Sequence, residues 1–212
     1  MENKGTGERV LGVILAGGLS RRMGGGDKGL LVLAGRPVLG HVIGRFAPQV
    51  DRLVLNANGD PARWRSFGLH VVPDTLPDRP GPLAGVLAAM DWAAENAADC
   101  GWLAAVPCDT PFLPPDLVAR LRQAAGASSW AVAESAGRRH PTVALLRLDL
   151  RDQLAGFLAA GGRRAGEFSC EAPTAAFPAE PVDPFLNLNT PEQLAQAERL
   201  VVDSRRQRGD ET

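Results

Sequence analysis

The sequence predicts an α/β fold in which a mostly parallel sheet lies between two layers of helices, with an appended pair of strands. Over the first 125 residues, short apolar runs alternate with stretches of helical composition, which is typical of βαβ units. Beyond residue 130 the pattern changes to two apolar runs bridged by a polar segment, which favours a strand pair. At 212 residues and 45% hydrophobic side chains, the chain can bury a substantial core and has the length of one domain.

Four apolar runs in the first half have the length of buried strands, and the stretches between and after them are expected to be helical. Expected strands are 10–15, 53–55, 69–72 and 102–106, and expected helices are 38–46, 86–98 and 117–125. The last of these helices follows two prolines, which are favoured where a helix begins. Parallel sheets are buried on both sides, so we expect helices on both faces.

In the second half, the strand pair is expected at 130–133 and 142–146, bridged by polar residues 134–140. A helix at about 150–160 is followed by an irregular, proline-containing segment that extends to Phe185. The last helix is expected to begin in the sequence TPEQ at 190–193, which combines a capping box with proline in the first turn. A single domain at 10–202 is then flanked by polar ends, 1–9 and 203–212, which we expect to be flexible.

Charge and composition exclude several classes of protein. The 23 basic and 24 acidic residues leave a formal net charge of −1, so no global positive field attracts nucleic acid or an anionic membrane. No apolar run approaches the roughly 18 residues of a membrane span, and the N-terminus lacks the apolar stretch of a signal peptide. Three cysteines without paired spacing argue against a disulfide framework or a zinc site, and the three histidines are isolated. We therefore expect a cytoplasmic protein.

A glycine-rich loop with basic side chains follows the first expected strand. Residues 15–28 have the sequence LAGGLSRRMGGGDK. A phosphate chain needs several backbone N–H donors at close range together with cations. Gly17 and Gly18 leave the backbone bare, Arg22 can bind bidentately, and Lys28 supplies a point charge. These residues predict a triphosphate site in preference to an ordinary flexible surface loop.

Two better-known phosphate motifs do not fit this loop. A P-loop requires Ser or Thr directly after its lysine, whereas Lys28 is followed by glycine. The pattern GxGxxG does begin at Gly24, but the apolar run 30–33 after it resembles a strand more than the helix that a dinucleotide site requires. The second expected strand also ends in Asn56 instead of an acid for the ribose. A dehydrogenase of the Rossmann type is therefore disfavoured.

A carboxylate lies at the end of a later strand, in the sequence PCDTP at 107–111. Open α/β sheets bind their ligands at the carboxyl ends of the strands, which places Asp109 where it can hold Mg²⁺. Magnesium is commonly bound by one or two carboxylates together with substrate phosphates. The alternative is that Asp109 caps the following turn. Cys108 has no activating base nearby in the sequence, so we interpret it as a small buried residue.

A third loop, DTLPDRPGPLAG at 74–85, again joins an expected strand to a helix. Gly81 and Gly85 allow a base to lie against bare backbone, and Asp74 offers an acceptor to a sugar or base. The alternative is a simple capped turn, and Asn56 at the end of the second strand has the same ambiguity.

Over about residues 10–200, these segments resemble the molybdenum cofactor guanylyltransferases. The matching motifs are LAGG with RMG and DK, NAN at 56–58, the aspartate with GPLAG, CDTP, HPT at 140–142 and FLNLNTP at 185–191. The order and spacing agree throughout, although sugar-nucleotide and cytidylyl relatives share the glycine loop. The resemblance implies a Rossmann-like three-layer nucleotidyltransferase fold.

It also implies a magnesium-dependent enzyme that transfers GMP from GTP to molybdenum-molybdopterin, with release of pyrophosphate and formation of the guanine dinucleotide cofactor. The finished cofactor would be handed to molybdoenzymes or their chaperones. The alternatives are a cytidylyltransferase acting on the same pterin, a sugar-phosphate nucleotidyltransferase, or a nucleotide-binding regulatory module without turnover.

By this resemblance, Arg22, Lys28 and Asp109 are the catalytic residues, and Asp109 binds the metal. The predicted nucleotide contacts are Leu15, Ala16, Gly17, Gly18, Lys28, Asn56, Asp74, Gly81 and Asp109. Asn187 and Asn189 are further hydrogen-bonding candidates at the far edge of the site. For the anionic pterin the candidates are Arg138, Arg139, His140, Arg163 and Arg164, with solvated surface charge as the alternative.

Overall fold

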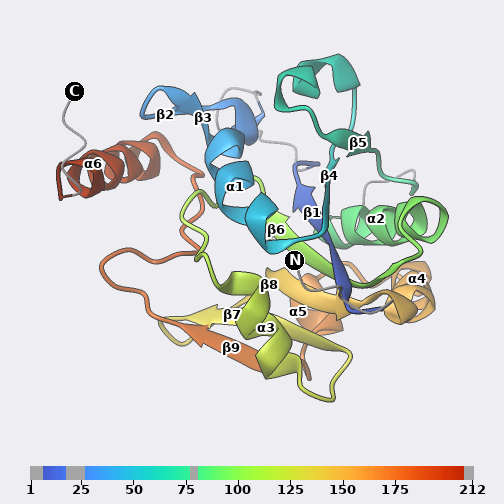
Figure 1. The fold of residues 1–212 in the computed structure, drawn as a ribbon. Coiled ribbons are helices and arrows are strands. Elements are labelled where there is room, and N and C mark those ends of the chain that lie inside the picture. Colours follow the sequence, from blue (N-terminus) through green and yellow to red (C-terminus); the bar gives the residue numbers. More distant parts are fainter. Residues whose placement is uncertain (1–6, 18–26, 77–80, 208–212) are drawn as a thin grey trace.

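The computed structural model describes residues 7–17, 27–76 and 81–207, with side chains up to residue 202. Most strands form one seven-stranded sheet in the order β5-β4-β1-β6-β8-β7-β9, as Figure 1 shows. These strands are β1 (Arg9–Leu15), β4 (Arg52–Asn56), β5 (His70–Val72), β6 (Cys100–Pro107), β7 (Trp130–Ser135), β8 (Arg138–Arg147) and β9 (Thr174–Phe177). A second, two-stranded sheet consists of β2 (Val32–Leu33) and β3 (Arg36–Pro37).

The register of the central strands aligns their carboxyl ends. β1 pairs in parallel with β4 on one side and with β6 on the other. Leu15, the last residue of β1, lies opposite both Asn56 and Pro107. Residues that follow these three strands therefore emerge at one edge of the sheet, where ligands of α/β folds bind.

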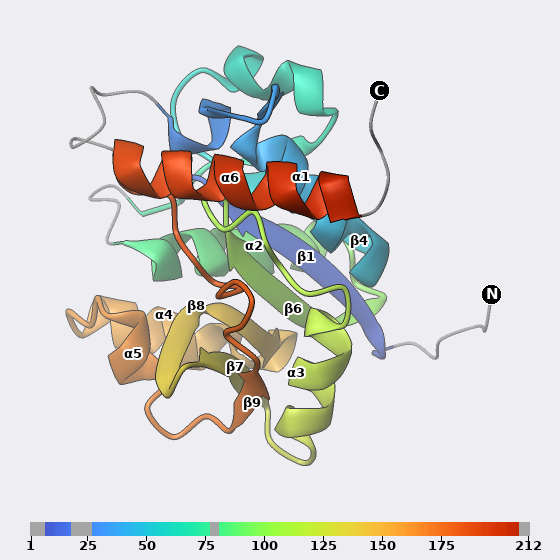
Figure 2. The ribbon, with the colours of Figure 1, turned by 90° about the vertical axis from the view of Figure 1, so that its left-hand side faces the viewer.

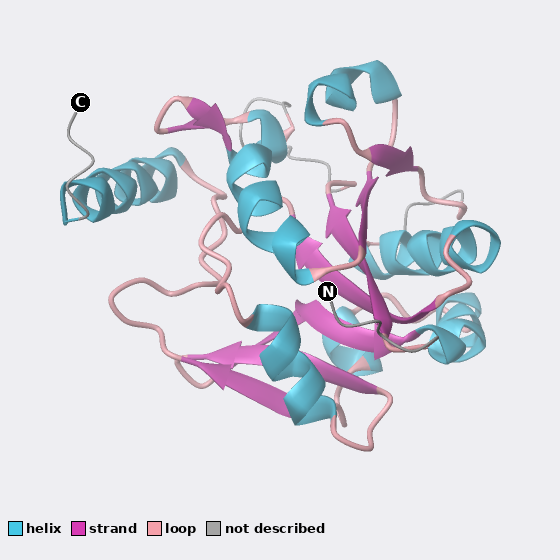
Figure 3. Cartoon of the chain, in the orientation of Figure 1, coloured by secondary structure: helices cyan, strands magenta, loops and turns pink. Residues whose placement is uncertain are grey.

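Helices cover both faces of the sheet, as predicted, and Figure 3 shows the two layers. They are α1 (Val38–Phe46), α2 (Pro82–Asn96), α3 (Leu117–Ala125), α4 (Arg151–Ala159), α5 (Ala165–Phe168) and α6 (Pro191–Gln207), with short 3-10 turns at Lys28–Leu30, Ala47–Gln49, Pro61–Phe67 and Leu148–Leu150. Ile14 packs in the buried cluster that contains α1 and α3, whereas its neighbour Val13 packs with α2, α4 and α5. The strands alternate their side chains between these two cores. Within the described residues, no helix has both the length and the apolar character needed to cross a membrane.

The predicted elements of the first half are confirmed, and the largest shift in a boundary is at the start of α2. α1 and α3 have the predicted bounds, and the four strands agree to within two residues. α2 begins at Pro82, one turn earlier than predicted, because Gly81 adopts φ 88° at the N-cap and proline fits the first helical position. The apolar run 30–33 is wrong as a strand in its first half, since Lys28–Leu30 forms a 3-10 turn.

The second half corrects several expectations. The strand pair is joined by a tight turn at Ala136 and Gly137, both with positive φ, and β8 pairs antiparallel with β6, so the pair extends the main sheet. The segment before Phe185 contains α5 and β9, which are too short to give a recognisable periodicity. The capping box is confirmed: Thr190 Oγ1 accepts from the Gln193 N–H at 3.3 Å, and Gln193 Oε1 accepts from the Thr190 N–H at 3.1 Å.

Regular structure includes described residues just outside the predicted domain range 10–202. The Gly7 N–H donates to the Asp99 carbonyl at 3.2 Å, and Arg9 is already part of β1, where its guanidinium pairs with Asp99. At the other end the helical backbone of α6 continues to Gln207. Backbone hydrogen bonds therefore hold residues on both sides of the range 10–202.

Candidate functional site

A cleft of about 1090 Å³, counting the part that is open to solvent, lies at the carboxyl edge of the sheet. The carboxyl ends of β1, β4 and β6 meet there with described residues that follow β1, β5 and β6 and with the beginning of α2. Its lining is Leu15, Ala16, Gly17, Lys28, Asn56, Asp74, Gly81, Pro82, Pro107, Cys108, Asp109, Thr142 and Asn187. Eight of the residues predicted to contact a nucleotide are in this set. The ninth predicted contact, Gly18, and the predicted catalytic residue Arg22 lie outside the described residues.

Lys28 and Asp109 form an ion pair inside the cleft. Lys28 Nζ lies 3.1 Å from Asp109 Oδ2, and the side chains are 26% and 8% exposed. Lys28 also donates a hydrogen bond to the side-chain oxygen of Asn189. A charge as buried as that of Asp109 requires a partner, so each member of the pair orients the other. The Asp109 carboxylate therefore pairs with Lys28 in the cleft and is not only a cap for the turn that follows β6.

Asp74 is held by two asparagine side chains. Asn56 Nδ2 donates to Asp74 Oδ1 at 2.9 Å, and Asn58 Nδ2 donates to Asp74 Oδ2 at 2.7 Å. Asn58 also accepts from the Asp74 N–H at 3.0 Å, and Asn56 donates to the Val72 carbonyl at 3.1 Å. Each carboxylate oxygen keeps a lone pair for a ligand. Sequence reasoning did not assign a role to Asn58, although the NAN motif contains it.

Asn56 and Asn58 lie so close to Gly85 and Gly17 that these two positions have little room for a side chain. A Cβ on Gly85 would lie 2.1 Å from Asn56 Oδ1, and a Cβ on Gly17 would lie 3.1 Å from Asn58 Nδ2. Gly85 therefore makes room for a buried side chain that is only 2% exposed. The sequence suggested instead that Gly85 makes room for a base. Gly81 lies at the cleft with φ 88°, a conformation that favours glycine.

The cleft chemistry favours charge compensation over covalent catalysis. Burial, reinforced by the charge of Asp109, raises the pKa of the Cys108 thiol to about 12, so the thiol stays protonated at neutral pH and is not a nucleophile. Among the residues that the structure describes, no group of three or more His, Cys, Asp or Glu side chains could hold a metal. One carboxylate beside a lysine fits Mg²⁺ that receives its other ligands from phosphates and water.

Most of the candidates for the pterin have protein partners. The Arg139 guanidinium donates to the carbonyls of Ser169, Cys170 and Ala172 at 2.6–3.1 Å. Arg163 donates to two carbonyls at the end of α4, and Arg164 pairs with Glu167. His140 is 9% exposed. Of the five, Arg138 is exposed and has no side-chain hydrogen bond or ion pair among the described residues.

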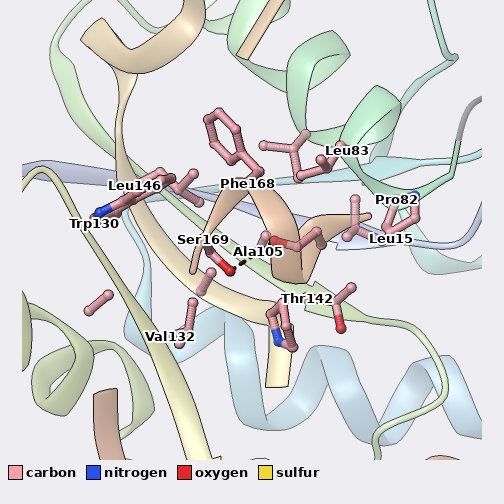
Figure 4. Close-up of a pocket in the computed structure, with 15 residues that line it drawn as sticks. Leu15, Pro82, Leu83, Ala105, Trp130, Val132, Thr142, Leu146, Phe168 and Ser169 are labelled. Atoms are coloured by element: carbon pink, nitrogen blue, oxygen red, sulfur yellow. Dashed lines mark hydrogen bonds between the residues drawn. The ribbon is translucent and has the colours of Figure 1, made fainter. Parts of the chain in front are cut away.

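A small apolar pocket adjoins the cleft (Figure 4). It shares Leu15, Pro82 and Thr142 with the cleft and extends beneath α5. Trp130 and Phe168 close it with an edge-to-face contact of 4.9 Å between ring centroids. The wall between β8 and α5 is therefore hydrophobic where it meets the polar cleft.

Known proteins share this fold and sequence. Residues 12–171 match the family model of the MobA-like NTP transferase domain. The chain is 52% identical over 202 residues to a molybdenum cofactor guanylyltransferase of Rhodopseudomonas palustris, covering 91% of this chain and 95% of the relative. It is 50% identical to one of Bradyrhizobium, covering 90% and 92%.

Among solved structures, the molybdopterin-guanine dinucleotide biosynthesis protein A of Archaeoglobus fulgidus superposes with a TM-score of 0.70 at 21% identity, covering 92% of this chain and 99% of that one. The structural likeness supports the fold, and the high identity over nearly the whole chain supports the family. The chain belongs to the MobA-like NTP transferases, in the family of the molybdenum cofactor guanylyltransferases.

Proposed function

We propose that this protein transfers GMP from GTP to molybdenum-molybdopterin, forming the guanine dinucleotide cofactor and pyrophosphate. The observation that carries the proposal is the meeting of Lys28, Asp109 and Asp74 in one cleft, within a chain about half identical to molybdenum cofactor guanylyltransferases. This arrangement provides cationic and metal-binding groups at one place and a hydrogen-bonding group for a nucleoside at another.

At the phosphate end, Asp109 would hold Mg²⁺, which when bound supplies positive charge to the phosphate oxygens. Lys28, oriented by Asp109 and Asn189, compensates the charge on the α-phosphate and the departing pyrophosphate. Arg22, which lies outside the described residues, is proposed to bind the triphosphate from the glycine loop.

The chemistry needs little more than positioning. An oxygen of the pterin's terminal phosphate forms a bond to the α-phosphorus of GTP while the bond from that phosphorus to the α–β bridging oxygen breaks, and this oxygen leaves with pyrophosphate. The attacking phosphate is already anionic at neutral pH, so no general base is required. This agrees with a described cleft lining that contains no histidine and a Cys108 thiol that stays protonated.

At the nucleoside end, Asp74 is the acceptor for the sugar or the base. Both of its oxygens are already oriented by Asn56 and Asn58, so binding a nucleotide requires little further ordering of this side chain. Leu15, Ala16, Gly17 and Gly81 complete the proposed contacts, together with Gly18 of the glycine loop.

We infer that the reaction takes place in the cytoplasm, where the three free cysteines remain reduced and the product can pass to molybdoenzymes or their chaperones. The decisive experiment incubates the purified protein with Mg²⁺, molybdenum-molybdopterin and one nucleoside triphosphate at a time, followed by identification of the product. We expect the guanine dinucleotide. A cytosine dinucleotide would overturn the choice of nucleotide, and binding of GTP without any product would favour a regulatory module.

A further inference from the structure

Figure 2 shows the connection from β9 to α6, and residues 183–190 of it are called the strap. Asn187 of the strap lines the cleft. The Leu188 N–H donates to the carbonyl of Asp109 at 3.0 Å, and Asn189 accepts from Lys28. The C-terminal end of the strap is thus fastened directly to the two residues that form the ion pair in the cleft.

The other end of the strap is fastened to a buried polar network. Ser135 Oγ lies 2.8 Å from both Asp183 Oδ1 and His140 Nε2, and Ser135 is only 2% exposed. Since the hydroxyl donates its one hydrogen to the Asp183 carboxylate, it must accept from His140, whose Nε2 therefore carries the proton. This chain of hydrogen bonds runs from β8 through β7 to the strap.

Asp183 and His140 also contact Phe185, two residues further along the strap. The Phe185 N–H donates to Asp183 Oδ1 at 3.0 Å, and the Phe185 ring lies against that of His140, with centroids 4.8 Å apart. Burying polar groups is costly unless each has a partner, and a network with all partners present specifies one arrangement. The network therefore fixes the position of the N-terminal end of the strap against β7 and β8.

From these contacts we propose that Ser135 and His140 are positioning residues, which act through Asp183 to hold Asn187 and Asn189 in the cleft. This inference rests on the proposed function and adds residues that do not line the cleft themselves. A strap fastened at one end only would have to be ordered when substrate binds, and that ordering would weaken binding and slow transfer.

The test compares two buried serines. Ser135→Ala removes the central hydroxyl of the network, and Ser169→Ala removes a hydroxyl that is 5% exposed and donates to the Ala165 carbonyl within α5. We expect Ser135→Ala to lower kcat/KM for guanylyl transfer about tenfold, the scale of losing one buried hydrogen bond. Ser169→Ala, which leaves the strap untouched, should retain wild-type kcat/KM. Thermal unfolding of both variants shows whether either change is merely structural.

A double-mutant cycle separates positioning from general destabilisation. If Ser135 acts through the strap, adding Ser135→Ala to Asn187→Ala/Asn189→Ala lowers kcat/KM no further than Asn187→Ala/Asn189→Ala alone, whereas additive losses would contradict the proposal. Should Ser135→Ala not fold, His140→Phe keeps a ring against Phe185 while removing the Nε2–H donor, and it should show the same non-additivity.

Activity of the wild-type protein separates a failure of the proposed function from a failure of the positioning role of Ser135. Absence of guanine dinucleotide from the wild type would overturn the proposed function. An active wild type together with an equally active Ser135→Ala variant would overturn the positioning role alone.

Discussion

Lys28 Nζ lies 3.1 Å from Asp109 Oδ2, although 81 positions separate the two residues in the chain. The pair forms because β1 and β6 are adjacent and parallel, with Leu15 opposite Pro107. Leu15 and the two residues after it therefore lie beside the end of β6, in the cleft that Lys28 also lines. A lysine beside a buried carboxylate keeps this charge compensated.

Substitution of Asp109 by alanine should abolish the metal-dependent step. Because the carboxylate is proposed to bind Mg²⁺ and to orient Lys28, we expect kcat to fall by about 10²-fold or more while the far-ultraviolet circular dichroism stays native. A matched control is Asp116→Ala, since Asp116 is 54% exposed and pairs only loosely with Arg120, at 3.7 Å. Wild-type turnover by Asp109→Ala would remove this residue from the metal site. Chelation of Mg²⁺ with EDTA should likewise stop the wild-type reaction.

Lys28→Met should weaken GTP binding about tenfold or slow transfer by a similar factor, because it removes a positive charge but keeps much of the side chain's length. Isothermal titration with GTP and steady-state kinetics would measure the two effects. Arg65→Ala is the control, since Arg65 is an exposed cation of the nearby 3-10 turn and does not line the cleft. If GTP affinity and kcat of Lys28→Met both equal those of the wild type, Lys28 is not part of the site.

Two glycines inside helices should respond oppositely to alanine. In Gly85→Ala the new Cβ would collide with Asn56, so we expect the free energy of unfolding to fall by about 1–3 kcal/mol and GTP binding to weaken. A Cβ added at Gly44, in α1, would meet open space within 4 Å, and Gly44→Ala should raise stability by roughly 0.5–1 kcal/mol. Chemical denaturation and GTP titration of both variants test the contrast. Equal stability of the two variants would contradict the close packing of Asn56 on α2.

Stability should decrease as the pH falls below about 6.5, in part because of His140. Burial lowers the pKa of His140 below its ordinary value of 6.5, with Arg138 adding to this effect and Asp183 opposing it. The folded protein therefore binds fewer protons than the unfolded chain in this range, and stability present above pH 6.5 is lost as the pH falls toward the folded-state pKa.

Unfolding measured between pH 7.5 and 5 should show a shallower pH dependence for His140→Phe than for the wild type. An unchanged slope in His140→Phe would mean that this imidazole does not titrate differently in the two states.

The sequence determined the features that depend on local patterns. Apolar runs of strand length, the helical composition of α1 and α3, and the capping box of α6 are each encoded within a few consecutive residues, because propensity and periodicity act over one or two turns. Asp109, Asn56 and Asp74 could be assigned to one edge as well, since parallel strands present their carboxyl ends together.

Only the tertiary structure decided which distant groups touch. Nothing in the sequence spacing predicts three of the contacts at or near the cleft. These are the hydrogen bond of Lys28 to Asn189, the hydrogen bond of Asn58 to Asp74, and the network of Ser135, His140 and Asp183. Such contacts depend on strand register and on the path of a connection, which are set by packing of the whole sheet and its helices. The short elements α5 and β9 belong to the same class, because four residues are stabilised by their neighbours and not by their own sequence.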